Sequence, residues 1–236
     1  MAYTKEYIVD TGFVDKNKRL SLSKLFLMFQ EVAEEHAEQL DIGRNKTTFA
    51  GRKWIITRYA VKFNRLPSYG EKVYMSTYPC KNNPFFFYRN FFLKDEKGEL
   101  LVIASSIWAV LDAKTNKIVT NPFGKTLPEE SFDFELDTPK KIDEDAFNKV
   151  KEHRVEYSDI DLNGHLNNTR YIELIQNLHD SDFYKDHEYE SFIVNYFSEI
   201  KEKELVSLYL DRSDNKEVVK GAVGERDSFK AIIEYK

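Results

Sequence analysis

Two stretches of the chain place hydrophobic residues at helical spacing. The first runs from residue 22 to residue 40, and its apolar side chains recur every three or four positions, so they share one face of a helix. Its apolar residues are Leu22, Leu25, Phe26, Phe29, Val32, Ala33, Ala37 and Leu40. The second runs from about residue 168 to residue 179, with Tyr171, Ile172, Leu174, Ile175 and Leu178. On the opposite face of the first helix we expect a solvated acidic surface, made by Glu31, Glu34, Glu35 and Glu38.

Strand-like segments surround each helix in the same order. Tyr3–Thr11 precedes the first helix, and a loop at residues 45–51 follows it. Four strands then come in succession, at Trp54–Phe63, Lys72–Tyr78, Phe85–Leu93 and Leu100–Leu111. In the second half one strand precedes the helix and four follow it, at Asn148–Tyr157 and then near Ser191–Ile200, Glu204–Asp211, Glu217–Val223 and Ser228–Tyr235. Each half is expected to be a long helix wrapped by a curved antiparallel sheet, in the α+β class.

The two halves are related by a direct repeat. Shifting the sequence by 146 residues aligns Lys5–Glu31 with Lys151–Asn177 without a gap and with seven identities. We interpret the chain as a tandem duplication. The segment 122–146 is rich in prolines and acids, and it is predicted to link an N-terminal domain at 1–121 to a C-terminal domain at 147–236.

A polar cluster lies where the second helix begins. Asp161, Asn163 and His165 occupy every second position, so in an extended or tightly turning segment they project to one side. Leu162 and Leu166 are then expected to face the interior. An acid, an amide and an imidazole beside the unpaired N–H groups of a helix N-terminus form the outline of a hydrolytic site. The alternative is an ordinary Asp-Asn-Gly turn, with the histidine satisfied near a helix cap.

The two repeats differ at the imidazole, because His165 corresponds to Arg19 in the first half. An arginine stays protonated and cannot shuttle a proton near neutral pH, whereas an imidazole can. If the chain is an enzyme, its second half carries the reactive group. The first half is then free to bind the substrate.

Composition and charge argue against several classes of protein. The 236 residues carry a net charge of −5, with lysines interspersed among acids, which argues against broad binding to nucleic acid. Cys80 is the single cysteine, and the five histidines have no familiar metal-ligand spacing. We therefore expect no disulfide, no metal and no cofactor.

No segment of the sequence predicts membrane insertion. The longest nearly apolar run, Leu101–Leu111, is interrupted by Ser105 and Ser106 and is too short to span a bilayer. The first residues lack the apolar core of a signal peptide and the Arg/Ser-rich bias of a transit peptide. We expect a cytoplasmic protein.

The residues around the polar cluster resemble a known family. The segment from Asp161 to Ile172 is similar to the Asp-x-Asn-x-His-x-Asn-Asn signature of the acyl-acyl carrier protein thioesterases of plants and bacteria. Supporting similarities are Gln30-Glu31-x-Ala33-x-x-His36, Trp54-x-x-Thr57-Arg58 and Ser106-Ile107-Trp108. The resemblance covers most of the chain. It implies a tandem hot-dog fold and hydrolysis of fatty acyl thioesters on acyl carrier protein, which releases a free fatty acid and ends chain elongation.

The resemblance also implies a set of catalytic residues: Asp161, Asn163, His165 and Glu199. Glu199 enters only through the family pattern, since an acid beside Lys201 and Lys203 is otherwise ordinary surface charge. Many plant members have a cysteine directly after this glutamate. This chain has Ile200 there.

The departure at Ile200 favours attack by water over a cysteine nucleophile. In this hypothesis His165, held by Asp161 or Glu199, orients or deprotonates the water, while Asn163 positions the thioester or a partner carboxylate. Backbone N–H groups at the start of the second helix stabilise the oxyanion. Direct attack by Asp161, which gives an anhydride, is the competing mechanism.

Three other functions are compatible with the same fold. An acyl-CoA thioesterase would use similar residues, whereas a hot-dog dehydratase removes water and does not require this constellation. A nonenzymatic acyl-binding protein would keep the pocket and tolerate the loss of His165. Single hot-dog domains commonly pair, so the duplicated chain is expected as a monomer that resembles a dimer, or as a homodimer.

Overall fold

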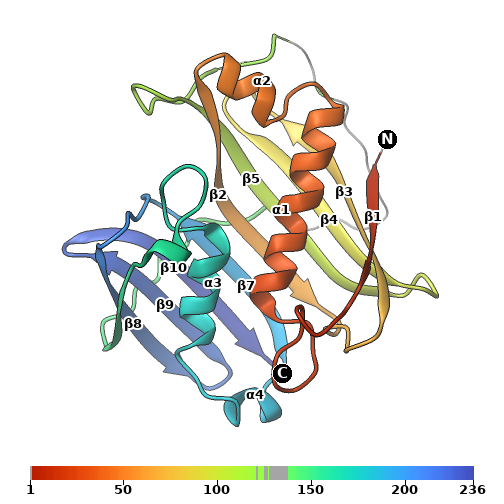
Figure 1. The fold of residues 1–236 in the computed structure, drawn as a ribbon. Coiled ribbons are helices and arrows are strands. Elements are labelled where there is room, and N and C mark those ends of the chain that lie inside the picture. Colours follow the sequence, from red (N-terminus) through yellow and green to blue (C-terminus); the bar gives the residue numbers. More distant parts are fainter. Residues whose placement is uncertain (1, 121, 125–126, 128–137) are drawn as a thin grey trace.

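One antiparallel sheet runs through the whole molecule (Figure 1). The computed structural model describes residues 2–120, 122–124, 127 and 138–236. In this part of the chain ten strands follow the order β1-β3-β4-β5-β2-β7-β10-β9-β8-β6 across the sheet. No helix among these residues is long and apolar enough to cross a membrane.

The N-terminal half contributes five strands and two helices: β1 (Tyr3–Ile8), α1 (Leu22–Gln39), α2 (Arg44–Phe49), β2 (Arg52–Phe63), β3 (Lys72–Asn82), β4 (Phe87–Asp95) and β5 (Leu100–Asp112). The C-terminal half contributes β6 (Lys149–Arg154), a 3₁₀ turn η1 (Tyr157–Asp159), α3 (Asn168–Gln176), α4 (Phe183–Asp186), β7 (Tyr189–Tyr196), β8 (Leu205–Ser213), β9 (Lys216–Val223) and β10 (Arg226–Tyr235).

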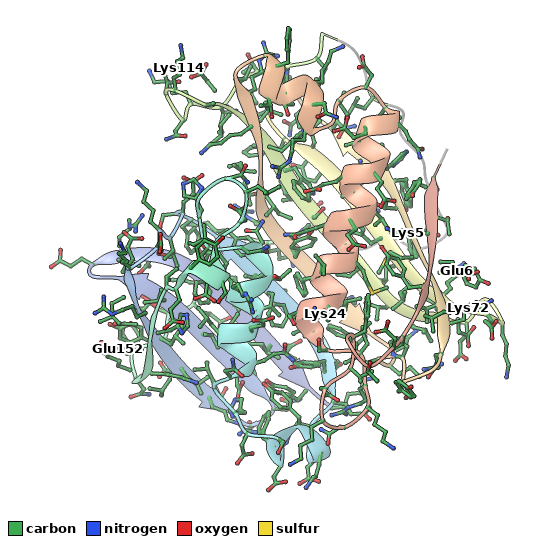
Figure 2. The ribbon with its side chains drawn as sticks, viewed as in Figure 1. Lys5, Glu6, Lys24, Lys72, Lys114 and Glu152 are labelled. Carbon is green, nitrogen blue, oxygen red and sulfur yellow. The ribbon has the colours of Figure 1, made fainter. Side chains whose placement is uncertain are left out.

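The two halves have the same topology. The order β1-β3-β4-β5-β2 in the first half corresponds, strand by strand, to β6-β8-β9-β10-β7 in the second. Helices α1 and α3 lie side by side on one face of the sheet, each across its own half (Figure 1). This is the tandem α+β hot-dog architecture expected from the sequence. Charged side chains such as Lys114 and Glu152 extend outward from both halves (Figure 2).

The halves join where β2 pairs with β7. The antiparallel register runs from Arg58 opposite Asn195 to Lys62 opposite Ser191. Phe26 of α1 lies over this seam, with its ring 5.0 Å from Tyr59 of β2 and 5.5 Å from Phe192 of β7. All three side chains are buried, so the halves share one core.

The observed boundaries of several elements differ from the predicted ones. The loop expected at residues 45–51 is mostly helix α2. It was hidden because only Thr47 of its six residues is buried, which leaves no apolar period to detect. The strands predicted to reach Tyr157 and Ile200 end at Arg154 and Tyr196, where the chain turns into the loops that form the site described below.

Part of the predicted linker at 122–146 falls on residues 125–126 and 128–137, which lie outside the described residues. The described parts pack against the sheet: Leu127 and Ile142 are buried, and the Ile142 N–H donates to Asn195 Oδ1 of β7 at 2.9 Å. The domain boundaries at 121 and 147 remain a prediction.

A glycine in β9 sets the position of α3. Gly221 lies opposite Phe229 of β10, and the Phe229 ring occupies the space that a side chain at 221 would need. This ring contacts Tyr171 of α3 edge-on, with the ring centres 5.2 Å apart. Tyr171 also packs against Tyr196 of β7, with the ring centres 5.3 Å apart. The start of α3 is therefore held against the sheet by aromatic contacts.

We expect Gly221→Ala to lower the free energy of unfolding by about 1–3 kcal/mol, as overpacking of a filled core does. The added Cβ would lie 1.9 Å from the Phe229 ring. Urea denaturation measures the change. Gly12→Ala is the control, because its Cβ meets only the Asp10 carboxylate at 3.3 Å. Equal losses in the two variants would show that the close contact is not what matters.

Candidate active site

The polar cluster forms a tight loop between η1 and α3. The Asp161 N–H donates to the His165 carbonyl at 2.8 Å, and the Gly164 N–H donates to the Asp161 carbonyl at 3.0 Å. Gly164 has φ of +79°, which glycine adopts without steric cost. The Asp161 carboxylate accepts from the N–H groups of Asn163 and His165 at 2.8 and 3.3 Å, and from Asn163 Nδ2 at 3.0 Å. Asp161 therefore holds the loop together.

The first half contains the same loop. The Asp15 N–H donates to the Arg19 carbonyl at 2.8 Å, and the Lys18 N–H donates to the Asp15 carbonyl at 3.0 Å. The Asp15 carboxylate accepts from the N–H groups of Asn17 and Arg19 at 2.8 and 3.0 Å. Lys18 has φ of +61°, at the position of Gly164. The repeat found by shifting the sequence is thus a repeat of backbone geometry. The interpretation of the motif as an Asp-Asn-Gly turn is correct for its backbone.

The loop does not alternate as a strand would. Leu166 is 2% exposed, as expected, but Leu162 is 90% exposed. The expectation that both leucines face the interior is wrong for Leu162, because the chain reverses at Asn163 and Gly164. The Leu166 N–H donates to the carbonyl of Ile200 at 2.7 Å, which ties the loop to the segment after β7.

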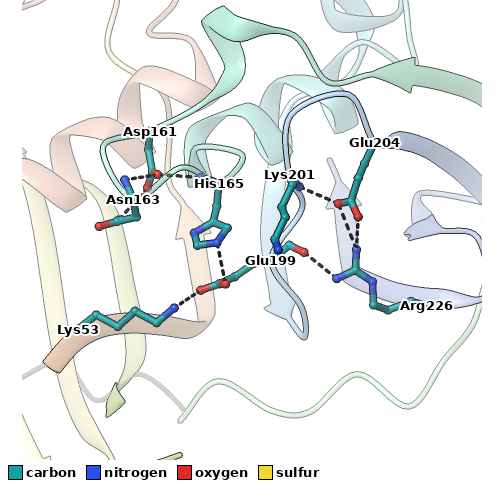
Figure 3. A network of polar contacts seen from close by, with 8 residues as sticks. All are labelled: Lys53, Asp161, Asn163, His165, Glu199, Lys201, Glu204 and Arg226. Carbon is teal, nitrogen blue, oxygen red and sulfur yellow. Dashed lines mark hydrogen bonds and ion pairs between the residues drawn. The ribbon is translucent and has the colours of Figure 1, made fainter. Parts of the chain in front are cut away.

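His165 and Glu199 meet at this junction (Figure 3). His165 Nε2 lies 2.9 Å from Glu199 Oε2, and the other carboxylate oxygen of Glu199 lies 2.7 Å from Lys53 Nζ. Of the two acids proposed to hold the imidazole, Glu199 contacts it, while Asp161 contacts the His165 main chain. Asn163 lies in the same loop, so the four residues named from the sequence come together here.

A second set of contacts fixes the backbone of Glu199 (Figure 3). Arg226 donates to the Glu199 carbonyl at 2.8 Å and to both oxygens of Glu204 at 3.1 and 3.2 Å. Glu204 in turn accepts from the Lys201 N–H at 2.7 Å. The main chain at 199 is therefore held independently of its carboxylate.

The start of α3 offers one N–H group to a developing anion. Asn167 is the N-cap, and its side chain accepts from the Thr169 N–H at 3.0 Å. The Arg170 N–H donates to the Asn167 carbonyl at 2.8 Å, and the Asn167 N–H donates to the Asp159 carbonyl at 2.9 Å. Of the four N–H groups that open the helix, only that of Asn168 lacks an acceptor among the described residues. The oxyanion site expected from several helix N–H groups reduces to this one.

The catalytic candidates lie where two cavities meet. The larger cavity, about 1140 Å³, is lined by residues of both halves, including Trp54, Phe87 and Trp108. The smaller one, about 440 Å³, adjoins it. Lys53, Asn163, His165 and Glu199 line both.

The acidic face of α1 is solvated and also borders the larger cavity. Glu31 and Glu34 line that cavity, and their side chains are 37% and 63% exposed. Partial desolvation raises the pKa of Glu34, although Arg44 opposes this change. Helical spacing shows which residues share a face, but it does not indicate that two of these acids border a cavity.

Among the described residues near the loop, there is neither a cysteine nor a cluster of possible metal ligands. Ile200, where many plant members have cysteine, is fully buried, and Cys80 lies in β3 and is partly buried. Within the described ranges, no group of three or more His, Cys, Asp or Glu side chains is arranged to hold a metal.

Sequence reasoning missed Lys53, Arg226 and Asp159. Lys53 and Arg226 act across long separations, so no local spacing indicates them. Asp159 left a signal in Glu156-x-x-Asp159, a capping box around η1. Its carboxylate accepts from the Glu156 N–H at 3.0 Å and lies 2.8 Å from His153 Nε2.

Comparisons with known proteins identify the class. Residues 1–122 match the acyl-ACP thioesterase N-terminal domain, and residues 142–230 match the acyl-ACP thioesterase C-terminal domain. The chain therefore belongs to the acyl-ACP thioesterase family.

Individual relatives are distant in sequence and near in fold. An acyl-ACP thioesterase from Bacteroides thetaiotaomicron superposes with a TM-score of 0.92 at 25% identity, covering 100% of this chain and 98% of that one. The 12:0-ACP thioesterase from Umbellularia californica gives 0.86 at 18% identity, covering 100% and 97%. The chloroplastic acyl-[acyl-carrier-protein] hydrolase FATB3 of Cuphea viscosissima is 22% identical over 73% of this chain and 45% of its own length. The chain thus spans about half the length of several curated relatives that it matches.

We expect Asp159→Asn to lower the free energy of unfolding at neutral pH by about 1–3 kcal/mol, since a buried hydrogen-bonded carboxylate is lost. Burial alone would raise the pKa of Asp159, but the Glu156 N–H, His153 and Arg170 together lower it. A lowered pKa gives stability that is present above the unfolded-state pKa and is lost as pH falls through the folded-state value.

The difference between wild type and Asp159→Asn should therefore shrink when urea unfolding is repeated below about pH 4. Asp143→Asn is the control, because the Asp143 side chain is 81% exposed beside Lys141. A difference that stays constant with pH would mean that the carboxylate is not the source of the stability.

Proposed function

We propose that the protein hydrolyses the thioester bond between a fatty acyl chain and acyl carrier protein. The observation that carries this proposal is the contact between His165 and Glu199 at the junction of two cavities. A general base must lie where the acyl chain and the carrier arm meet, because the scissile bond joins them. Family membership supports the choice of substrate.

In the proposed mechanism water attacks the thioester carbonyl carbon. His165, oriented by Glu199, accepts a proton from the water as the C–O bond forms. The N–H of Asn168 and the amide of Asn163 are the donors available to the carbonyl oxygen as it becomes negative. The C–S bond then breaks, and the proton passes from His165 to the departing thiolate. The products are a free fatty acid and the carrier thiol.

The environment of Asp161 favours water over direct attack by this carboxylate. Both of its oxygens already accept hydrogen bonds from the loop. Attack by Asp161 would weaken these bonds. Because they stabilise the ionised carboxylate, they also make it a poorer nucleophile. Asp15 holds the equivalent loop in a half that lacks the imidazole, which fits a scaffolding role for both aspartates.

We assign acyl-chain binding mainly to the N-terminal half and the chemistry to the C-terminal half. Support comes from the rings of Trp54, Phe87 and Trp108, which line the larger cavity from β2, β4 and β5. A cytoplasmic location and a monomeric or homodimeric state remain predictions. The proposed reaction requires no cofactor.

His165→Ala should lower kcat by about 10²–10⁴-fold, the usual contribution of a general base. The measurement is steady-state hydrolysis of acyl carrier proteins with C8 to C18 chains, with the matching acyl-CoAs in parallel. The parallel assay decides between the two carriers. His187→Ala is the matched control, since His187 flanks α4 and lines neither cavity. If the wild type binds acyl chains but hydrolyses the thioester of neither carrier, the protein is a binding module.

Asp161→Asn should retain activity, with kcat about 10–100-fold below wild type, because an amide oxygen can still accept from the loop N–H groups while the loop shifts slightly. Asp15→Asn is the control: it should weaken the equivalent loop of the first half and leave kcat unchanged. If Asp161→Asn falls to the level of His165→Ala while its stability matches that of Asp15→Asn, then Asp161 is the nucleophile.

A further inference from the structure

Lys53 connects the two halves at the site itself. It lies at the start of β2, in the N-terminal half, and its ammonium group is 2.7 Å from Glu199 Oε1 (Figure 3). The other oxygen of the same carboxylate is 2.9 Å from His165 Nε2. Glu199 therefore bridges a lysine of one half and the histidine of the other.

The carboxylate of Glu199 depends on these two contacts for its orientation. Its main-chain carbonyl is fixed by Arg226, but that contact leaves the side-chain torsions free. Within the described part of the chain, Lys53 and His165 are the polar partners of its carboxylate. The side chain is 40% exposed and faces both cavities, so without Lys53 it can rotate away from the imidazole.

The position of Lys53 makes its ion pair with Glu199 strongest when substrate is bound. Its side chain is only 23% exposed, and it lines both cavities. An acyl chain and a carrier arm in these cavities displace water from around the pair. The attraction between the two charges then grows, because the surrounding dielectric constant falls.

We propose that Lys53 is a positioning residue for the reaction, which holds the Glu199 carboxylate so that its second oxygen fixes the imidazole of His165. This inference rests on the proposed hydrolytic function. It assigns to the N-terminal half a part in orienting the catalytic residues, in addition to binding the acyl chain. The active site is then complete only when β2 and β7 are paired.

Replacement of Lys53 separates positioning from binding. Lys53→Met should lower kcat on the preferred acyl thioester by about 10–100-fold, the usual effect of a misplaced catalytic group, with KM changed by less than about threefold. Lys53→Arg keeps a cation at this position and should recover at least about fivefold of the lost rate. Lys62→Met, at an exposed position of the same strand, is the control and should match wild type.

A double-mutant cycle with Glu199→Ala tests whether Lys53 acts through the carboxylate. If it does, adding Lys53→Met to Glu199→Ala changes the residual rate by less than about twofold, because the two effects are not additive. An equal loss in both backgrounds, or a rise in KM with kcat unchanged, would show that Lys53 acts on the substrate and would overturn the proposal. A wild type inactive on every thioester contradicts the hydrolytic function instead. An active wild type with Lys53→Met at full kcat contradicts only the role of Lys53.

Discussion

The pairing of β2 with β7 is the constraint on which the site depends. The two strands are antiparallel, with Arg58 of β2 opposite Asn195 of β7, so the residues of β2 before Arg58 extend past the end of β7. Lys53 lies in this extension and Glu199 lies in the segment after β7, so the register of one strand pair brings them together. Phe26 covers the seam from α1 and packs on both halves. Either half alone would expose an unpaired edge strand and part of an apolar core.

The duplication gives two equivalent loops with different surroundings. In the second half the loop places His165 between two cavities. In the first half Arg19 stands at the same position, and its guanidinium binds the carbonyl of Tyr184 and lies 4.0 Å from Glu188. The segment around α4 thus contacts the equivalent position in the first half. The two loops therefore differ in one side chain, Arg19 or His165, and in the segment that packs beside it. These differences make the first loop structural and the second a candidate catalytic loop.

The sequence was sufficient where local periodicity carries the information. Two amphipathic helices, the order of strands and the repeat all follow from spacing, and together they predicted the tandem fold. The sequence was insufficient where a contact joins distant segments. Nothing near Lys53 indicates that Glu199 lies beside it, because a strand register is set by the packing of the whole sheet. The prediction that Leu162 faces the interior was wrong for a local reason. A positive φ at Gly164 breaks the alternation of side chains that a strand would keep.

The motif that led to the site mixes two kinds of requirement. Asp161 and Gly164 build a turn, and the first half builds the same turn with Asp15 and Lys18 at the corresponding positions. His165, the Asn163 amide and the Asn168 N–H present groups that can meet a substrate. The acid that contacts the imidazole is Glu199, outside the motif, and its cation comes from the other half. The loop motif therefore marks where the reactive group lies, while the orientation of that group is set by residues 34 and 112 positions away from it, which the pairing of β2 with β7 brings near.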